Sequence, residues 1–256
     1  PFDLKDEEKN NPEARNRIVK AGLDGALAAS PALFYNKKDA NLISIGNLED
    51  DIDKLAECDW IVEVVVENLK IKQELFAKIE KVRKPGSIIT SNTSGIPLQD
   101  ISQKFSDEMK QHFMGTHFFN PVRYMHLLEL IPGAETLPEV LDFIAAFGER
   151  NLGKGIVWAK DTPNFVGNRI GIQGIGAIFK FMAEEKLTIA EVDTIFGTSL
   201  GRPKTGIFKL VDLVGLDTII HVCKNSYELC VDDEQRDVLV LPDFIGKMDE
   251  NKWYGN

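Results

Sequence analysis

The sequence lacks the features that mark secreted, zinc-binding or membrane-spanning proteins. It contains three cysteines, Cys58, Cys223 and Cys230, whose odd number and wide spacing fit neither a disulfide framework nor a metal site. No apolar run approaches the roughly 20 residues that a membrane-spanning helix needs. We therefore expect a cytoplasmic protein with no metal site and no membrane span.

Basic residues are scarce relative to acidic ones. The chain has 30 lysines and arginines against 40 aspartates and glutamates, which gives a formal net charge of −10. This balance argues against nucleic acid as a partner, and it offers no general attraction for a polyanionic ligand. In a chain of 256 residues, 43% hydrophobic residues supply enough apolar side chains for one large or two modest domains.

The order of the predicted elements divides the chain into two domains. Residues 1–159 alternate strand and helix patterns, which is typical of βαβ units and predicts an α/β fold. Residues 160–256 show helical patterns only, which predicts an all-α domain. The run over 60–66 is almost continuously apolar, as expected for a parallel strand buried on both faces. The predicted elements of the first domain are helices over 12–30, 68–82 and 137–151 and strands over 41–45, 60–66, 87–90 and 155–159.

A histidine and a glutamate stand symmetrically about a predicted turn in the segment GTHFFNPVRYMHLLEL, residues 115–130. Pro121 cannot continue a central strand, so we expect the chain to turn there. If the flanking runs pair antiparallel about Arg123, His117 lies opposite Glu129, because both are six positions from the centre. Opposed side chains have Cβ atoms about 4.5–5.5 Å apart. A carboxylate at that distance fixes the tautomer of the imidazole and raises its basicity, as in a general base with its orienting partner.

The same pair has a purely structural interpretation, a half-buried strand histidine with an acid nearby, and from these two residues alone that interpretation is the more frequent one. Polar residues at other strand ends favour a site. The strands predicted to end at 66–68, 91–94 and 117–120 all point to one edge of the sheet. The carboxyl edge of an open α/β sheet is where ligands bind.

Four motifs in order carry a resemblance to a known family. They are SNTSG at 91–95, HFFNP at 117–121, DTPNFVGNRI at 161–170 and GRPKTGIFKLVDLVGLDT at 201–218. Together they resemble the 3-hydroxyacyl-CoA dehydrogenase family, in particular the bacterial long, multidomain type of fatty-acid β-oxidation. The resemblance runs from about residue 48 onward. It implies a Rossmann-like NAD-binding domain and a helical C-terminal domain for substrate and dimerisation, which together oxidise (S)-3-hydroxyacyl-CoA to 3-oxoacyl-CoA with NAD.

The resemblance implies four catalytic residues. His117 would be the general base that takes the 3-hydroxyl proton as hydride leaves C3. Glu129 would orient the imidazole and stabilise its protonated form. Ser94 and Asn168 would bind the substrate oxygen, one from each domain. Taken singly, Ser94 is also explained as a helix cap and Asn168 as a helix-face amide.

The resemblance also implies contacts with NAD. Glu67 and Lys72, in the segment VENLKIK, match positions that reach the nicotinamide half of the cofactor, and Ser94 and Asn120 would lie near it. A solvated ion pair is the structural alternative for Glu67 and Lys72. The substrate would be an acyl-CoA thioester, the protein a homodimer through its helical domain, and a hydratase domain or partner is possible in the full-length protein.

The chain departs from the family at its start. It contains no strand followed by a G-x-G-x-x-G turn, whose amides hold the pyrophosphate of a dinucleotide. Gly171, Gly174 and Gly176 have the wrong spacing and lie in a helical pattern, so close helix packing explains them better. We therefore expect an N-terminally truncated chain that lacks the first βαβ arm and binds NAD weakly. Loss of that arm predicts an uncovered sheet edge that is either repaired or self-associating.

Two other functions remain open at this point. A noncatalytic acyl-CoA-binding or structural protein of the same fold would account for the missing cofactor turn, although the retained His117 and Glu129 speak against it. A dehydrogenase of a free small hydroxy acid would need an arginine to bind the carboxylate, and Arg123 and Arg169 are available. Dependence of the activity on the CoA group of the substrate distinguishes this enzyme from a 3-hydroxyacyl-CoA dehydrogenase.

Overall fold

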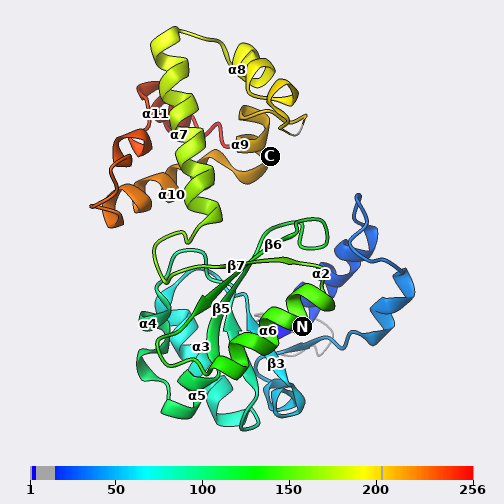
Figure 1. The fold of residues 1–256 in the computed structure, drawn as a ribbon. Helices are drawn as coiled ribbons and strands as arrows, with labels where there is room; N and C mark the ends of the chain where they lie inside the picture. Colours follow the sequence, from blue (N-terminus) through cyan, green and yellow to red (C-terminus); the bar gives the residue numbers. More distant parts are fainter. Residues whose placement is uncertain (1, 4–14, 203, 256) are drawn as a thin grey trace. The chain divides into compact units, whose positions relative to one another are not determined.

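The computed structural model describes residues 2–3, 15–202 and 204–255 (Figure 1). The chain divides into two compact units, Pro1–Asp161 and Thr162–Asn256. The first is a mixed α/β unit and the second, in its described residues, is helical. Among the described residues, no helix combines the length and the apolar character needed to cross a membrane.

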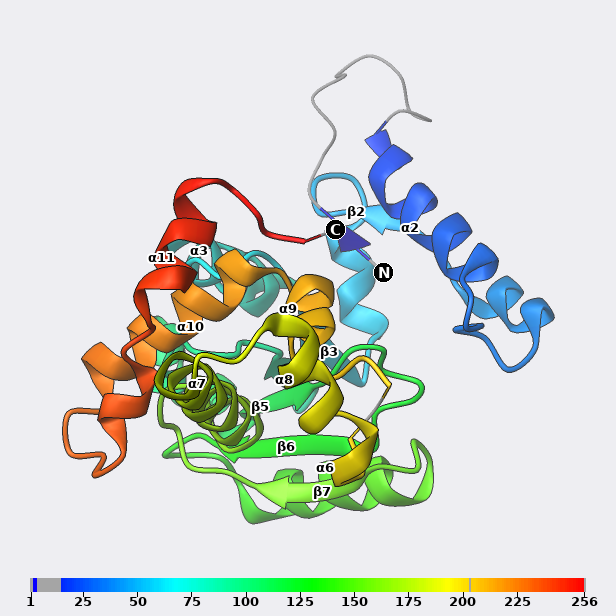
Figure 2. The same cartoon turned by 90° about the horizontal axis from the view of Figure 1, so that it is seen from above.

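A five-stranded sheet forms the centre of the first unit (Figures 1 and 2). Its spatial order is β3-β4-β5-β6-β7, with β3, β4 and β5 parallel, β6 antiparallel to β5, and β7 parallel to β6. The strands span Trp60–Glu63, Ile88–Ser91, Phe113–Phe118, Leu127–Pro132 and Gly155–Trp158. A second, two-stranded parallel sheet joins β1, Phe2–Asp3, to β2, Gly46–Asn47.

Helices cover both faces of the five-stranded sheet, and strand alternation decides which side chains each face receives. Phe113 packs edge-on against Phe76 of α3 and Phe105 on one face. Met114, the next residue, belongs to the cluster formed with Val140 and Ile144 of α6 on the other face. The described helices of this unit are α2 Arg17–Ala28, η1 Lys37–Leu42, η2 Ile52–Glu57, α3 Leu69–Val82, α4 Leu98–Ile101, η3 Ser102–Lys104, α5 Asp107–Gln111 and α6 Pro138–Arg150.

Capping and turn residues set several bounds as predicted. The Asn68 side chain accepts a hydrogen bond from Ile71 N at 3.1 Å and begins α3, which ends at Val82. Strand β4 follows the turn at Pro85-Gly86, and α6 and β7 lie where the sequence predicts them. The helix predicted over 12–30 is observed as α2; residues 12–14 lie outside the described part of the chain.

Two strand predictions are wrong. Residues 41–42 end the 3₁₀ helix η1, which Asn36 caps by accepting from Lys38 N, and the nearby strand covers only residues 46–47. Leu42 is 86% exposed, so this short apolar run has no surface to pack against. The strand predicted over 60–66 is shorter than expected, since β3 ends at Glu63, and it is not buried on both faces. In the described residues β3 pairs with β4 alone and is an edge strand, which leaves three valines exposed at 62, 64 and 66.

The second unit packs its helices around one apolar cluster that includes Phe179, Val192, Val211 and Leu216. Gly176 of α7 lies against η5, where an added Cβ would approach the carbonyl oxygen of residue 238 to 2.3 Å. Close packing thus explains Gly176 but not the glycines at 171 and 174, which face open space. The described helices are α7 Gly167–Glu185, α8 Ile189–Ile195, η4 Thr198–Leu200, α9 Phe208–Val214, α10 Leu216–Leu229, η5 Arg236–Leu239 and α11 Asp243–Glu250.

Cys223 of α10 is fully buried in this cluster, and burial raises the pKa of its thiol to about 11. Because the thiolate is the reactive form, we expect iodoacetamide at pH 8 to leave Cys223 unmodified in the folded protein. The half-buried Cys58 is the internal control and should be alkylated first. Mass spectrometry of the peptides, with and without urea, measures both rates; equal rates without urea would contradict the prediction.

Candidate active site

His117 and Glu129 face each other across the β5–β6 hairpin. The two strands pair antiparallel with His117 directly opposite Glu129, as the sequence predicts, and the chain turns between them at Pro121. His117 Nδ1 lies 2.6 Å from Glu129 Oε2, and both side chains are almost completely buried. A carboxylate only accepts hydrogen bonds, so Nδ1 carries a proton and Nε2 of the neutral ring is left as the acceptor.

Ser94 supplies the partner of that second nitrogen. It lies in the loop that follows β4, and its Oγ is 3.0 Å from His117 Nε2. In the neutral ring with its proton on Nδ1, the serine hydroxyl donates to Nε2. Ser94, His117 and Glu129 therefore form a continuous hydrogen-bonded chain drawn from the loop after β4 and from strands β5 and β6, and Nε2 of the neutral ring is the atom that can receive a proton.

Glu67 holds the loop that carries Ser94. Its Oε1 accepts from the Thr93 hydroxyl at 2.5 Å and from the backbone N–H groups of Ser94, Gly95 and Ile96 at 3.0, 3.1 and 3.4 Å. Burial raises the pKa of the Glu67 carboxyl, but hydrogen bonding by Thr93, the charge of Lys72 and two backbone amides outweigh it and hold the pKa below its usual value. Glu67 is therefore ionised near neutral pH, which strengthens each of these hydrogen bonds.

Lys72 is buried beside Glu67 rather than exposed to solvent. Its Nζ contacts Glu63 Oε1 and Oε2 at 2.9 and 3.0 Å and Glu67 Oε2 at 3.3 Å, and its side chain is 1% exposed. The Glu63 side chain is 0% exposed and also accepts from Ser91 Oγ at 2.5 Å. The pair Glu67–Lys72 is therefore not a solvated surface pair, and it continues into the interior through Glu63.

Sequence reasoning missed Glu63 and Asn92. Glu63 had a visible signal, since it is the one charged residue inside the apolar run WIVEVVV, and a charge in such a run calls for a buried partner. Asn92 ties the loop to β5 by accepting from Phe118 N at 2.9 Å, while its own N–H donates to Glu63 O. Nothing in the sequence distinguishes Asn92 from a turn asparagine.

Asn120 takes no part in this chain of hydrogen bonds, and Asn168 belongs to the second unit. Asn120 is exposed in the loop after β5, and Asn168 lies in the first turn of α7 in the second unit. Their proposed contacts with cofactor and substrate stay predictions. In the same motif, Asn164 has φ +60°, a left-handed conformation that asparagine tolerates, and its Nδ2 donates to the buried Ser226 Oγ at 2.5 Å.

Both arginines considered for a carboxylate site have other partners. Arg123 donates to the carbonyl oxygens of Ala32 and Phe34 at 2.6 and 2.8 Å and lies over the ring of Tyr35. Arg169 pairs with Asp233 at 2.6 Å, a contact that raises the pKa of its guanidinium. These contacts argue against a dehydrogenase of a free hydroxy acid.

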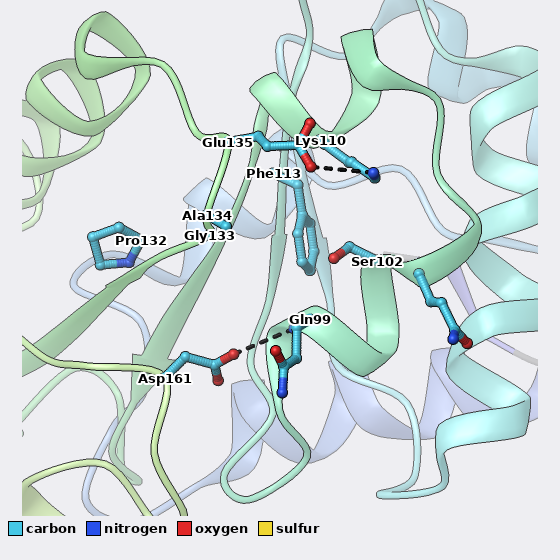
Figure 3. Close-up of a pocket in the computed structure, with 10 residues that line it drawn as sticks. Gln99, Ser102, Lys110, Phe113, Pro132, Gly133, Ala134, Glu135 and Asp161 are labelled. Atoms are coloured by element: carbon cyan, nitrogen blue, oxygen red, sulfur yellow. Dashed lines mark hydrogen bonds and ion pairs between the residues drawn. The ribbon is translucent and has the colours of Figure 1, made fainter.

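A pocket of 470 Å³ lies elsewhere in the first unit, beside the first residue of β5 (Figure 3). Phe113 and the ion pair between Lys110 and Glu135, 3.1 Å apart, line it. Asp161 also lines it and accepts from Leu98 N at 2.9 Å at the start of α4. The pocket contains none of the candidate site residues. It lies at the first residue of β5, whereas His117 lies near the other end of that strand.

Comparison with known proteins gives a consistent result across both units. Residues 3–162 match the family described as the NAD binding domain of 3-hydroxyacyl-CoA dehydrogenase, and residues 165–254 match its C-terminal domain. A probable 3-hydroxyacyl-CoA dehydrogenase of Bacillus subtilis is 47% identical over 262 residues, which covers 100% of this chain and 33% of that protein.

A second relative and a solved structure are also similar to this chain. A putative fatty acid oxidation complex trifunctional enzyme of Rickettsia felis is 38% identical over 94% of this chain and 34% of its own length. The crystal structure of an (S)-3-hydroxybutyryl-CoA dehydrogenase from Ralstonia eutropha matches 95% of this chain and 84% of that one, with a TM-score of 0.77 and 27% identity. The chain thus spans about a third of the length of these two longer relatives.

Proposed function

This chain belongs to the 3-hydroxyacyl-CoA dehydrogenase family, and on that premise we propose that the protein oxidises (S)-3-hydroxyacyl-CoA thioesters to 3-oxoacyl-CoA with NAD in fatty-acid β-oxidation. The observation that carries the proposal is the hydrogen-bonded chain Ser94–His117–Glu129, in which the His117–Glu129 pair is buried and Ser94 is half-buried. An imidazole with an acceptor nitrogen beside a serine hydroxyl, and a carboxylate that fixes its tautomer, are suited to removing the proton of an alcohol. Residues 1–159 would bind NAD, and residues 160–256 would bind substrate and the second subunit.

In the proposed reaction His117 Nε2 takes the proton of the 3-hydroxyl group as the C3–H bond breaks. Glu129 stabilises the imidazolium that forms, and the Ser94 hydroxyl turns from His117 to donate to the substrate oxygen. Asn168 of the helical unit would donate to the same oxygen. NAD, held at the strand ends, would supply the acceptor for the hydride from C3. In the reverse direction His117 returns its proton to the oxygen, so the assignment holds for both directions.

The residues at the strand ends fit the nicotinamide half of NAD. The Glu67 side chain is 43% exposed even though it holds the loop, so part of this carboxylate is open to accept from a ribose hydroxyl or a carboxamide. Asn120 is exposed and offers both a donor and an acceptor. Because Lys72 is buried, we favour an indirect role, in which it holds Glu67 in place for the cofactor. A direct contact of Lys72 with the cofactor stays a prediction.

A polypeptide of these 256 residues alone is expected to bind NAD with an affinity weaker than micromolar. The reason is that its sequence contains no glycine-rich turn, and the amides of that turn hold the pyrophosphate in dinucleotide-binding domains. Isothermal titration of the polypeptide with NAD measures the affinity, and AMP serves as the reference ligand. A dissociation constant in the micromolar range would contradict the prediction.

The direct test of the function is oxidation of NADH with acetoacetyl-CoA. The assay should be run on the printed 256 residues and on the complete product of the reading frame that encodes them, with free acetoacetate as the control substrate. Turnover of the thioester alone supports the proposal. Turnover of free acetoacetate at a similar rate would favour the hydroxy-acid enzyme, and acyl-CoA binding without turnover in either form would favour the noncatalytic protein.

We further propose that the helical unit forms a homodimer. Ile170, Leu213 and Trp253 are 67, 68 and 61% exposed in it, and these apolar side chains are available for a second chain to cover. Sedimentation at micromolar concentration should give twice the mass of one chain, whereas a monomer would overturn this proposal. The Rickettsia relative is named as a trifunctional enzyme, and we also propose that the whole protein carries, or associates with, a further activity of fatty-acid oxidation, for which a hydratase is the candidate.

A further inference from the structure

The ion pair between Glu63 and Lys72 needs an explanation beyond stability. Both side chains are at most 1% exposed, and the ammonium contacts both carboxylate oxygens. Burial of two charges costs so much hydration that replacing such pairs by apolar residues is often neutral or even stabilising. The geometry of their neighbours supplies the explanation.

The ammonium of Lys72 connects two carboxylates with different surroundings. Glu63 is held from several sides, by Ser91 Oγ at 2.5 Å and by Val65 N at 2.6 Å, and is fixed to the sheet. Glu67 lies outside the strand and is 43% exposed, so its position depends on what holds it. Lys72 Nζ, 3.3 Å from Glu67 Oε2, thereby links this partly exposed carboxylate to the sheet.

Glu67 transmits that position to the reacting groups. Its other oxygen, Oε1, accepts from three consecutive backbone N–H groups that begin at Ser94. The hydroxyl of the same serine contacts His117 Nε2 at 3.0 Å. Displacement of reacting groups by about 1 Å can lower a rate on the order of 100-fold, so a loop that carries Ser94 must be held closely.

We propose that Glu63 and Lys72 are positioning residues of the active site, which act through Glu67 to hold the Ser94 loop against His117. This role requires no contact of Glu63 with substrate or cofactor, and it is separate from the direct cofactor contact predicted for Lys72. The inference rests on the proposed function for its effect on catalysis, but the mechanical link from Glu63 to the loop can be tested without any activity.

Glu63→Gln is the informative variant, because it keeps the shape of the side chain and removes the charge that holds Lys72. Hydrogen exchange of the 256-residue chain should show at least tenfold faster exchange of the amides of residues 94–96. Ser91→Ala, which removes one hydrogen bond and no charge, should show a smaller change in the same direction and replaces the first variant if that one does not fold.

The matched control is Arg83→Met. Arg83 is another buried cation of this unit, with a side chain 3% exposed and paired with Glu108, but it follows the last residue of α3 and donates to Ser87 O, before β4 begins. It should speed exchange near residues 83–87 and leave residues 94–96 unchanged. Unchanged exchange at 94–96 in Glu63→Gln, or equal acceleration there in Arg83→Met, would overturn the proposal.

In the form of the protein that turns over acetoacetyl-CoA, Glu63→Gln should lower kcat about tenfold and change the KM for the thioester less than twofold. Arg83→Met should leave both constants within twofold. A rise in KM at constant kcat would overturn a positioning role. If the unmodified protein has no activity, the proposed function fails, and the exchange measurement still decides whether Glu63 holds the loop.

Discussion

Replacement of His117 by glutamine is expected to lower kcat for the reduction of acetoacetyl-CoA by a factor of about 10² to 10⁴, the usual contribution of a positioned general acid or base. Glutamine can still donate to Glu129 and contact Ser94, so the hydrogen-bonded chain survives in outline. It cannot exchange a proton near neutral pH, and the proton for the substrate oxygen must then come from water. The KM for the thioester should change little, since the loss concerns the transition state.

The control for this variant is His126→Gln. His126 is an exposed histidine of the same unit that contacts the carbonyl oxygen of Gly153 through Nδ1, and kcat should stay within twofold. Steady-state NADH oxidation measures both. If His117→Gln kept more than a tenth of the parent kcat, the imidazole would not be the base, and the pair with Glu129 would be only structural.

Replacement of Lys72 by methionine is expected to lower the free energy of unfolding of the first unit by about 3–5 kcal/mol, because Glu63 then keeps a charge in the interior without its cation. Lys70→Met is the matched control on the same helix. Its side chain is 85% exposed and 3.9 Å from Glu74, and removal of such a surface pair costs about 0.5 kcal/mol or less.

Urea unfolding in a Trp253→Phe background follows the first unit alone, because the remaining tryptophans, Trp60 and Trp158, both belong to it. If Lys72→Met lowered the free energy of unfolding by less than about 1 kcal/mol, the order of an ordinary surface substitution, the prediction would be contradicted. The unpaired charge of Glu63 would then cost little in the interior. The double variant Glu63→Leu/Lys72→Met should regain most of the stability, since no unpaired charge remains. It should not regain kcat if the pair acts by positioning.

The elements governed by local rules could be predicted from the sequence. Asn68 caps its helix through a side-chain oxygen, and the placement of His117 and Glu129 six positions to either side of Arg123 predicted their pairing. The strand over 41–45 failed because apolar residues form a strand only where a partner strand and a packing surface exist. No local pattern supplies either of these.

The inner part of the site could not be predicted for a different reason. Lys72 reads as one of several lysines on an amphipathic helix, and its burial depends on Glu63, nine residues earlier and on another element. The loop is held because three of its backbone N–H groups donate to the Glu67 carboxylate. Such donors are present in every residue except proline, so the sequence does not reveal them. The chemistry-bearing residues were thus visible in the sequence, while the residues that hold them were mostly not.

Strand β5 has a consequence for which insertions this protein can accept. His117 and Phe113 are four residues apart and share a face, whereas Met114 lies on the α6 face. One residue added inside β5 between Phe113 and His117 would turn the imidazole toward α6 and away from Ser94. The general base would then be lost from the site. Residues added between 119 and 126 lengthen a loop and leave the strand pairing intact. Length variation among natural relatives should therefore collect in that loop and be absent from the four residues before it.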